Sequence, residues 1–205
     1  MTEQKRKEIS DWVSIHVSPG TKFTIDDNGE VDVKGSVIVW NEDDFSVKFK
    51  KISGSLIVFM GKMDDLSFCP AEIGLNFEIS HSTIKSLKGF PKKVGHKITL
   101  RGNAGLTSLR FFPKKVFGDC VIAENVNIKS LKYGPVECYG DFYCYDNGLT
   151  NFDHCPQKLS GFLSTGNPVY KAGIYTDELT GIKYKCNESL LFNLLNFSKV
   201  ERISQ

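Results

Sequence analysis

The residues of this chain that could perform chemistry include six cysteines and four histidines, and their spacing assembles no known site. Zinc ligands usually come in pairs two to four residues apart, and neither a Cys-x-x-Cys nor a His-x-x-x-His pair occurs. Phosphate-binding, dinucleotide-binding, nucleophile-elbow and zinc-protease motifs are also absent. Asp153 and His154 adjoin each other without a nucleophile beside them. We therefore expect no catalytic residue, metal or cofactor, and a protein that is not an enzyme.

The cysteines have two possible structural roles. An even number would suit a secreted disulfide scaffold, but a chain of 205 residues does not need such cross-links to fold. No secretory signal is visible at the N-terminus, so we expect reduced, mostly buried thiols in a cytoplasm. The six residues are Cys69, Cys120, Cys138, Cys144, Cys155 and Cys186.

Lysine pairs form the second chemical feature. The segment 85–132 holds eleven Lys or Arg residues and two acidic ones, whereas the whole chain has a net charge of +2. A basic ridge of this kind binds phosphate groups or an acidic protein, or is simply a solvated edge. The lack of aromatic residues interleaved with the ridge counts against single-stranded nucleic acid. The ridge consists of Lys92, Lys93, Lys114 and Lys115.

The elements that position these residues follow from a repeat, which is marked by prolines 21 or 22 residues apart. These prolines are Pro70, Pro91, Pro113, Pro135 and Pro156. Each repeat contains a triple such as Ile98–Leu100 whose outer two residues are apolar, which predicts a short strand with one buried face. One repeat cannot bury its apolar edge alone, so we predict a solenoid with a parallel sheet of about seven short strands.

Other positions of the repeat have structural roles. Asn103, Asn125 and Asn147 follow the strands, where we expect them to hydrogen-bond turn backbone and to accept the left-handed conformation. Two further core residues lie three apart, as in Leu106 and Leu109. The cysteines fall in core positions of this pattern and act as small hydrophobic residues.

We expect one domain, with repeats at 31–168 between an N-terminal cap at 1–30 and a C-terminal cap at 169–205. Residues 3–17 have near-helical apolar spacing, and residues 22–33 read as a hairpin in which Asn28-Gly29 favours a type I′ turn. Residues 187–200 form an amphipathic helical pattern, which is either part of the cap or a partner-binding helix. No run of about 18 apolar residues is present, so we expect no membrane partner.

The repeat text resembles a known family. Units of the form LTSLxxxPKKVxGD, the string FYCYDNGLTN and the ending STGNPVY are similar to the leucine-rich-repeat-like proteins of large tailed bacteriophages. The resemblance covers about residues 50–170. It implies a curved leucine-rich-repeat-like solenoid in the cytoplasm of an infected bacterium, with a role in phage–host interaction and no catalytic site.

Outward strand positions form the candidate binding surface, because aromatic residues and arginine are typical of interface centres. The alternative for Ile38, Trp40, Ile57 and Phe59 is that they pack under the N-terminal segment. The candidate partner-binding residues are Tyr143, Tyr145, Arg101, Thr99, Glu78, Trp40 and Phe59.

Three functions remain open from the sequence. We favour a non-enzymatic protein that binds a host or phage protein and modulates or inhibits a bacterial defence protein, a step that rests on analogy. The alternative is a nucleic-acid or nucleotide-binding module that uses the lysine ridge. A structural or virion component, which would form large homo-oligomers, is the third.

Overall fold

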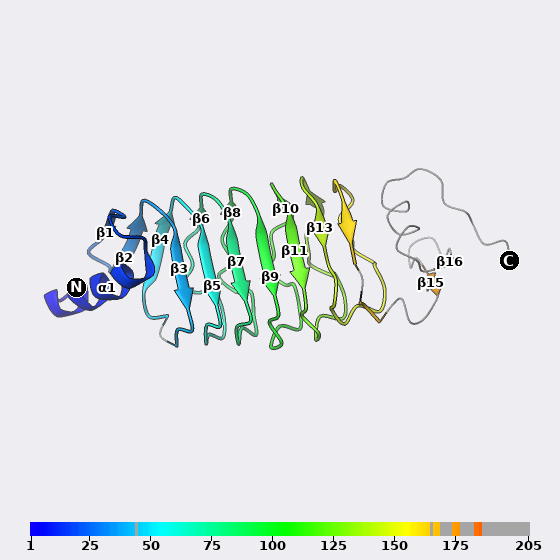
Figure 1. The fold of residues 1–205 in the computed structure, drawn as a ribbon, viewed down its shortest axis with the longest axis horizontal. Coiled ribbons are helices and arrows are strands. Elements are labelled where there is room, and N and C mark those ends of the chain that lie inside the picture. Colours follow the sequence, from blue (N-terminus) through cyan, green and yellow to red (C-terminus); the bar gives the residue numbers. More distant parts are fainter. Residues whose placement is uncertain (44, 165, 169–173, 177–182, 186–205) are drawn as a thin grey trace.

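The computed structural model describes residues 1–168, apart from 44 and 165, and the backbone of residues 174–176 and 183–185. Most of this part is a parallel β-solenoid of about six turns, in which successive coils stack along one axis (Figure 1). The single helix among the described residues is α1 (Glu3–His16), at the N-terminal end of the stack. The predicted solenoid is confirmed at this level.

The first sheet has seven strands, one from each coil, and every pair is parallel. The inward side chains of β3 to β13 are apolar and fully buried or nearly so, as the alternation in the sequence predicts, whereas Phe162 of β14 is partly buried. The strands, in chain order, are β3 (Val37–Trp40), β5 (Leu56–Phe59), β7 (Phe77–Ser80), β9 (Ile98–Arg101), β11 (Cys120–Ala123), β13 (Phe142–Tyr143) and β14 (Phe162–Leu163).

A second set of strands gives each coil before that of β14 a second strand, and the prediction of one strand per repeat is wrong on this point. Two residues such as Lys93–Val94 are too few to show a period of two, so the pattern hid these strands. The second sheet, in spatial order, is β1 (Phe23–Ile25), β2 (Glu30–Val33), β4 (Lys48–Ile52), β6 (Glu72–Ile73) and β8 (Lys93–Val94). β10 (Lys115–Val116) and β12 (Glu137–Cys138) form a further parallel pair.

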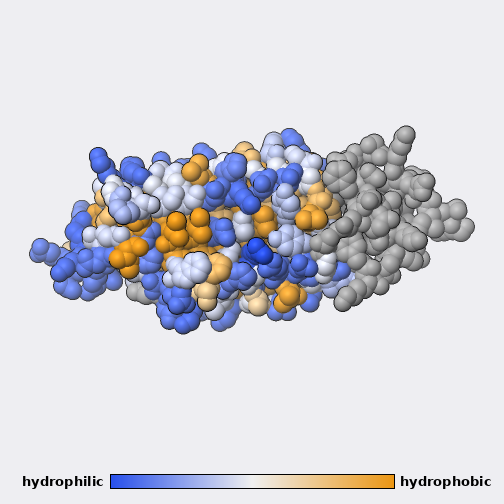
Figure 2. Space-filling model, viewed as in Figure 1, coloured by the Kyte–Doolittle hydropathy of each residue, from blue (hydrophilic) through white to orange (hydrophobic). Residues whose placement is uncertain are grey.

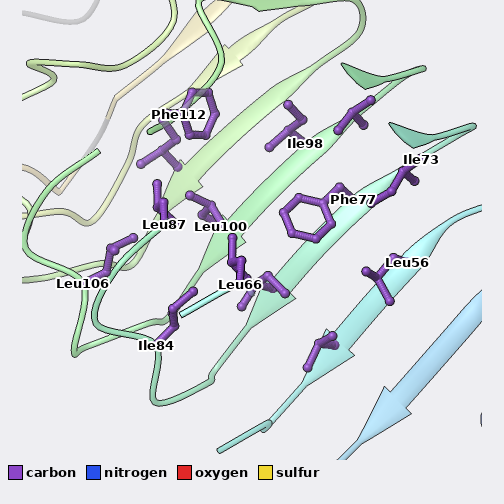
Figure 3. Packing of buried hydrophobic residues seen from close by; sticks show 14 of the residues in the cluster. Leu56, Leu66, Ile73, Phe77, Ile84, Leu87, Ile98, Leu100, Leu106 and Phe112 are labelled. Carbon is purple, nitrogen blue, oxygen red and sulfur yellow. The ribbon is translucent and has the colours of Figure 1, made fainter. Parts of the chain in front are cut away.

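The core lies inside the coils. In Figure 3, Phe77 and Leu100 of the first sheet point toward Leu66 and Leu87 of the loops that follow the strands. The predicted pairs of loop residues three apart, such as Leu106 and Leu109, are fully buried. Each such side chain contributes about 1.5–3 kcal/mol of transfer free energy, and it does so only because the next coil covers it.

Buried asparagines connect the coils at the corner after the first sheet. The Oδ1 atom of Asn125 accepts a hydrogen bond from the backbone N–H of Asn103 (3.0 Å), and its Nδ2 donates to the carbonyls of Leu100 (3.0 Å) and Ala123 (2.9 Å). Asn147 accepts from Asn125 in the same way (3.0 Å), and so does Asn167 from Asn147 (3.1 Å). The predicted bonding to turn backbone is confirmed, and the bonds run between coils.

The asparagines themselves are not the left-handed residues of this corner, so that part of the prediction is wrong. The residue before each one has the positive φ: Gly102 (66°), Glu124 (59°) and Asp146 (52°). The left-handed residue reverses the chain and points the following side chain into the coil, where its amide finds backbone partners.

The N-terminal segment packs at the first coil. Ile9 and Val13 of α1 are buried in the core, and Val17 forms an antiparallel bridge with Val37 of β3. The predicted hairpin is present as β1 and β2, but its turn is not type I′, since Gly29 has a positive φ (84°) and Asn28 does not. The carboxylate of Asp26 accepts hydrogen bonds from the N–H groups of Asn28 (2.9 Å) and Glu30 (3.0 Å), which favours a type I turn closed by glycine.

At the other end, β15 (Ile174–Thr176) and β16 (Lys183–Lys185) form an antiparallel pair that the sequence analysis did not predict. The amphipathic helix expected at 187–200 lies outside the described residues, as does Cys186.

The asparagine ladder predicts a large loss of stability in Asn125→Ala. The change removes the acceptor of the Asn103 N–H and a donor to two carbonyl groups in a buried corner, so we expect the free energy of unfolding to fall by about 2–4 kcal/mol in urea denaturation. Asn127→Ala is the control, because exposed Asn127 in the same coil makes one side-chain hydrogen bond, to the carbonyl of Ala104 (2.8 Å). Equal losses in the two variants would contradict a structural role for the ladder.

Candidate functional site

The first sheet presents one outward surface, here called the outer face, on which the predicted partner-binding residues lie in two columns. Strand register stacks Ile38, Ile57, Glu78, Thr99, Val121 and Tyr143 in one column. It stacks Trp40, Phe59, Ser80, Arg101 and Ala123 in the other, and Tyr145 extends that column two residues beyond Tyr143. Residues up to 107 positions apart in the sequence, Ile38 and Tyr145, are thereby placed on one surface.

The N-terminal half of the outer face is apolar and open. The ring of Trp40 stacks on that of Phe59 (centroids 4.2 Å apart), and the rings of Phe59 and His81 meet edge to face (centroids 5.1 Å apart). Trp40 is 65% exposed and Ile38 is 52% exposed, so the N-terminal segment does not cover these two residues. Figure 2 shows the hydrophobic colour gathered over β3 and β5. Of the two alternatives left by the sequence, the structure supports a free surface for Ile38 and Trp40, whereas Ile57 and Phe59 are half-buried.

The other half of the outer face is largely polar, although Val121 and Ala123 also lie in it, and the predicted binding residue Thr99 is buried there (8% exposed). Arg101 donates to Oε1 of Glu124 through Nη2 (2.6 Å) and Nε (2.9 Å), the Tyr143 hydroxyl donates to Asp141 (2.9 Å), and the Ser80 hydroxyl donates to Glu78 (2.7 Å). Acidic residues outnumber basic ones among the outward positions of β7 to β13 and their flanks. The acidic ones are Glu78, Asp119, Glu124 and Asp141, and the basic ones are Lys97 and Arg101.

These contacts set the charge states of the polar half. Hydrogen bonding from Arg101 lowers the pKa of the Glu124 carboxyl, and the Asp141 carboxylate that accepts from Tyr143 raises the pKa of that phenol. At neutral pH the carboxylate therefore stays charged and the phenol stays protonated. Groups held in these states act as fixed charges and hydrogen-bond donors, which suits recognition better than proton transfer.

The sequence analysis missed three residues of this surface, Met60, His81 and Glu124. All three occupy the left-handed corner position directly after the first-sheet strand (φ 58°, 52° and 59°). Strict alternation would point them inward, but the reversal of the chain leaves them exposed or half-exposed beside the outer columns. Their fixed offset, two residues after the end of each strand triple, was the signal that could have identified them.

The lysine ridge lies along the second set of strands. Lys93 and Lys115 lie on β8 and β10 with acidic neighbours in the same outward row: Lys93 is opposite Glu72, and Lys115 pairs with Glu137 at 3.0 Å. The inference that no aromatic residues interleave with the lysines is wrong. Exposed Phe117 and Tyr139 stack at 5.9 Å beside Lys115, and exposed Phe111 and Tyr133 precede Lys114 and Val136 by three residues.

The five described cysteines are free thiols, and Cys120, Cys138 and Cys144 are buried in core positions as predicted. Burial raises the pKa of Cys69, Cys120 and Cys144 well above its ordinary value, which keeps these thiols protonated and unreactive. Within the described residues no three His, Cys, Asp or Glu side chains gather closely enough to hold a metal ion.

None of the described helical segments has the length and apolar character required to span a bilayer. Comparison of the chain with protein-family models, with curated proteins and with solved structures finds no match.

The exposure of Trp40 predicts that the fluorescence of the two tryptophans of the chain is quenched to different extents. Trp12 is half-buried and stacks on His16 (3.9 Å), whereas Trp40 stands on the outer face. Acrylamide should therefore quench the fluorescence of a Trp12→Phe variant, which retains Trp40, much more strongly than that of Trp40→Phe. Equal quenching would show that Trp40 is covered in solution.

The Arg101–Glu124 pair predicts that the stability of the fold depends on pH. The pKa of Glu124 is lower in the folded chain than in the unfolded one, so the pair stabilises the fold above the unfolded-state pKa. This contribution disappears as the pH falls through the folded-state pKa. In an NMR titration we expect the Glu124 carboxyl to titrate below its ordinary value of 4.5 and its pKa to rise in Arg101→Met. Arg110→Met, a change on another side of the coil, should leave the Glu124 pKa unaltered, and a shift there instead would refute the assignment.

Proposed function

We propose that this chain is a non-enzymatic protein-binding solenoid and that the outer face of the first sheet is its binding surface. The observation that carries the proposal is the exposed Trp40–Phe59 stack beside Ile38, next to a hydrogen-bonded polar half. Large exposed apolar groups on a soluble protein mark interaction sites when they are contiguous. Tryptophan, tyrosine and arginine are also the residues that dominate interface energies.

The two halves of the outer face indicate the chemistry of the partner. The apolar half suits a protein surface with aliphatic or aromatic anchors, because stacked rings present their edges and an end face to it. The polar half carries more carboxylates than cations, so it suits basic side chains. A partner that combines an apolar anchor with lysine or arginine residues satisfies both halves.

The more specific expectations remain proposals. We propose a leucine-rich-repeat-like chain encoded by a large tailed bacteriophage, acting in the cytoplasm of the infected bacterium on a host protein, with inhibition of a defence protein as the most specific version. The repeat text of residues 50–170 supports this origin by resemblance. We further propose that α1 and the β1–β2 hairpin form the N-terminal cap, which the burial of Ile9 and Val13 supports.

Capture experiments with matched variants test the proposal. The immobilised chain is incubated with bacterial lysate, and the retained proteins are identified by mass spectrometry. Trp40→Ser combined with Ile38→Thr, and separately Tyr143→Ala combined with Tyr145→Ala, should reduce capture of the same protein. Thermal unfolding of the Trp40/Ile38 variant should be nearly unchanged, because both side chains are mostly exposed.

The control variant is Phe117→Ser, which removes a similarly exposed aromatic ring (56%) from the second-sheet side of the coil. Capture should survive this change. Capture that persists in both outer-face variants, or that is lost equally in Phe117→Ser, would contradict the proposal.

A further inference from the structure

Two exposed aromatic residues occupy a backbone position that favours glycine. Phe111 has φ 77° and is 52% exposed, and Tyr133 has φ 71° and is 47% exposed. They lie on consecutive coils, two residues before the repeat prolines, at the corners that precede β10 and β12. The equivalent residue of the preceding coil is Gly89, with φ 87°.

Folding alone does not explain these aromatic residues. A bulky residue in the left-handed region costs about 1–2 kcal/mol relative to glycine. The side chains recover little of this cost, because about half of each stays exposed and neither belongs to the core. Residues that combine a strained backbone with an exposed ring are expected where a ligand contacts the ring.

Basic residues flank the two rings on both sides. One row, directly before the ring position, consists of Lys88, Arg110 and Lys132 on three consecutive coils. A second row, three residues after the ring position, consists of Lys92 and Lys114. All five are exposed, and we call these five residues together with Phe111 and Tyr133 the aromatic corner.

Two of these cations contact the rings directly. The guanidinium carbon of Arg110 lies 5.1 Å from the centroid of Phe111, and the ammonium of Lys132 lies 5.3 Å from that of Tyr133. Lys114 donates hydrogen bonds to the carbonyl oxygens of Tyr133 and Gly134 (3.2 Å each), which holds its charge beside the Tyr133 ring. The next coil carries Asp153 and His154 at the corresponding positions, so the basic rows end there.

We propose that the aromatic corner binds single-stranded nucleic acid, with bases stacked on Phe111 and Tyr133 and phosphates held by the two basic rows. Unpaired bases offer flat faces to such rings, and each stacked base contributes about 1–3 kcal/mol. Lysine and arginine attract the phosphates without reading sequence. A duplex keeps its bases stacked inside and can use only the basic rows. The site is separate from the outer face, so its test is independent of the protein-binding proposal.

Fluorescence anisotropy of the full chain with a labelled oligo(dT) of about 12 nucleotides tests the site. We expect binding that weakens steeply with salt, and a duplex of the same length should bind much more weakly. Phe111→Gly combined with Tyr133→Gly should weaken oligo(dT) binding about tenfold or more. The thermal stability of this variant should be equal or higher, because glycine accepts the positive φ without strain.

The matched control is Met60→Gly, which places glycine at another exposed left-handed position (φ 58°) on the outer-face corner. It should leave oligo(dT) affinity unchanged. No measurable binding by the unaltered chain, equal affinity for single-stranded and duplex DNA, or full affinity in the Phe111/Tyr133 variant would each overturn the proposal. Lys92→Gln combined with Lys114→Gln should reduce the salt dependence, and an unchanged salt dependence would remove these lysines from the site.

Discussion

The register between successive coils is the constraint on which the rest of this structure depends. Backbone hydrogen bonds between parallel strands set it along the first sheet, and buried asparagine side chains set it at the corner that follows. Because an unpaired amide in that corner costs far more than an exposed one, a coil that slipped by one residue would lose both sets of bonds. The outward columns exist only because no such slip occurs.

In-register stacking gives the chain two surfaces of different character from one repeat. The outer face combines an apolar ring stack with an excess of carboxylates. The aromatic corner combines two aromatic residues that have a strained backbone with five cationic side chains. A net charge of +2 for the whole chain conceals this division, because acidic and basic residues are concentrated on different surfaces. Substitutions at exposed positions alter each surface without touching the core, so the repeat allows binding properties to vary at little cost in stability.

The sequence predicted the features that a period of 21 or 22 residues makes visible. The first-sheet strands, the inward position of residues such as Ile98 and Leu100, and the burial of Cys120 and Cys144 all follow from apolar alternation. Most of the second set of strands was missed because a strand such as Lys115–Val116 is too short to alternate. Glu124 and Phe111 were missed because a positive φ re-aims a side chain, and only Gly, Asn or Asp announces such a residue in a sequence. The exposure of Trp40 depended on where α1 packs, which local spacing does not determine.

Amide hydrogen exchange resolved by residue tests the coil register most directly. The backbone N–H groups of Asn103, Asn125 and Asn147 lie in a corner outside the strands, and each donates to the asparagine side chain of the next coil. We predict that these protons exchange as slowly as those of Leu100 and Ile122 within the sheet, because they open only when the coils separate. Exchange as fast as that of the exposed residues Thr107 and Thr150 would contradict the account.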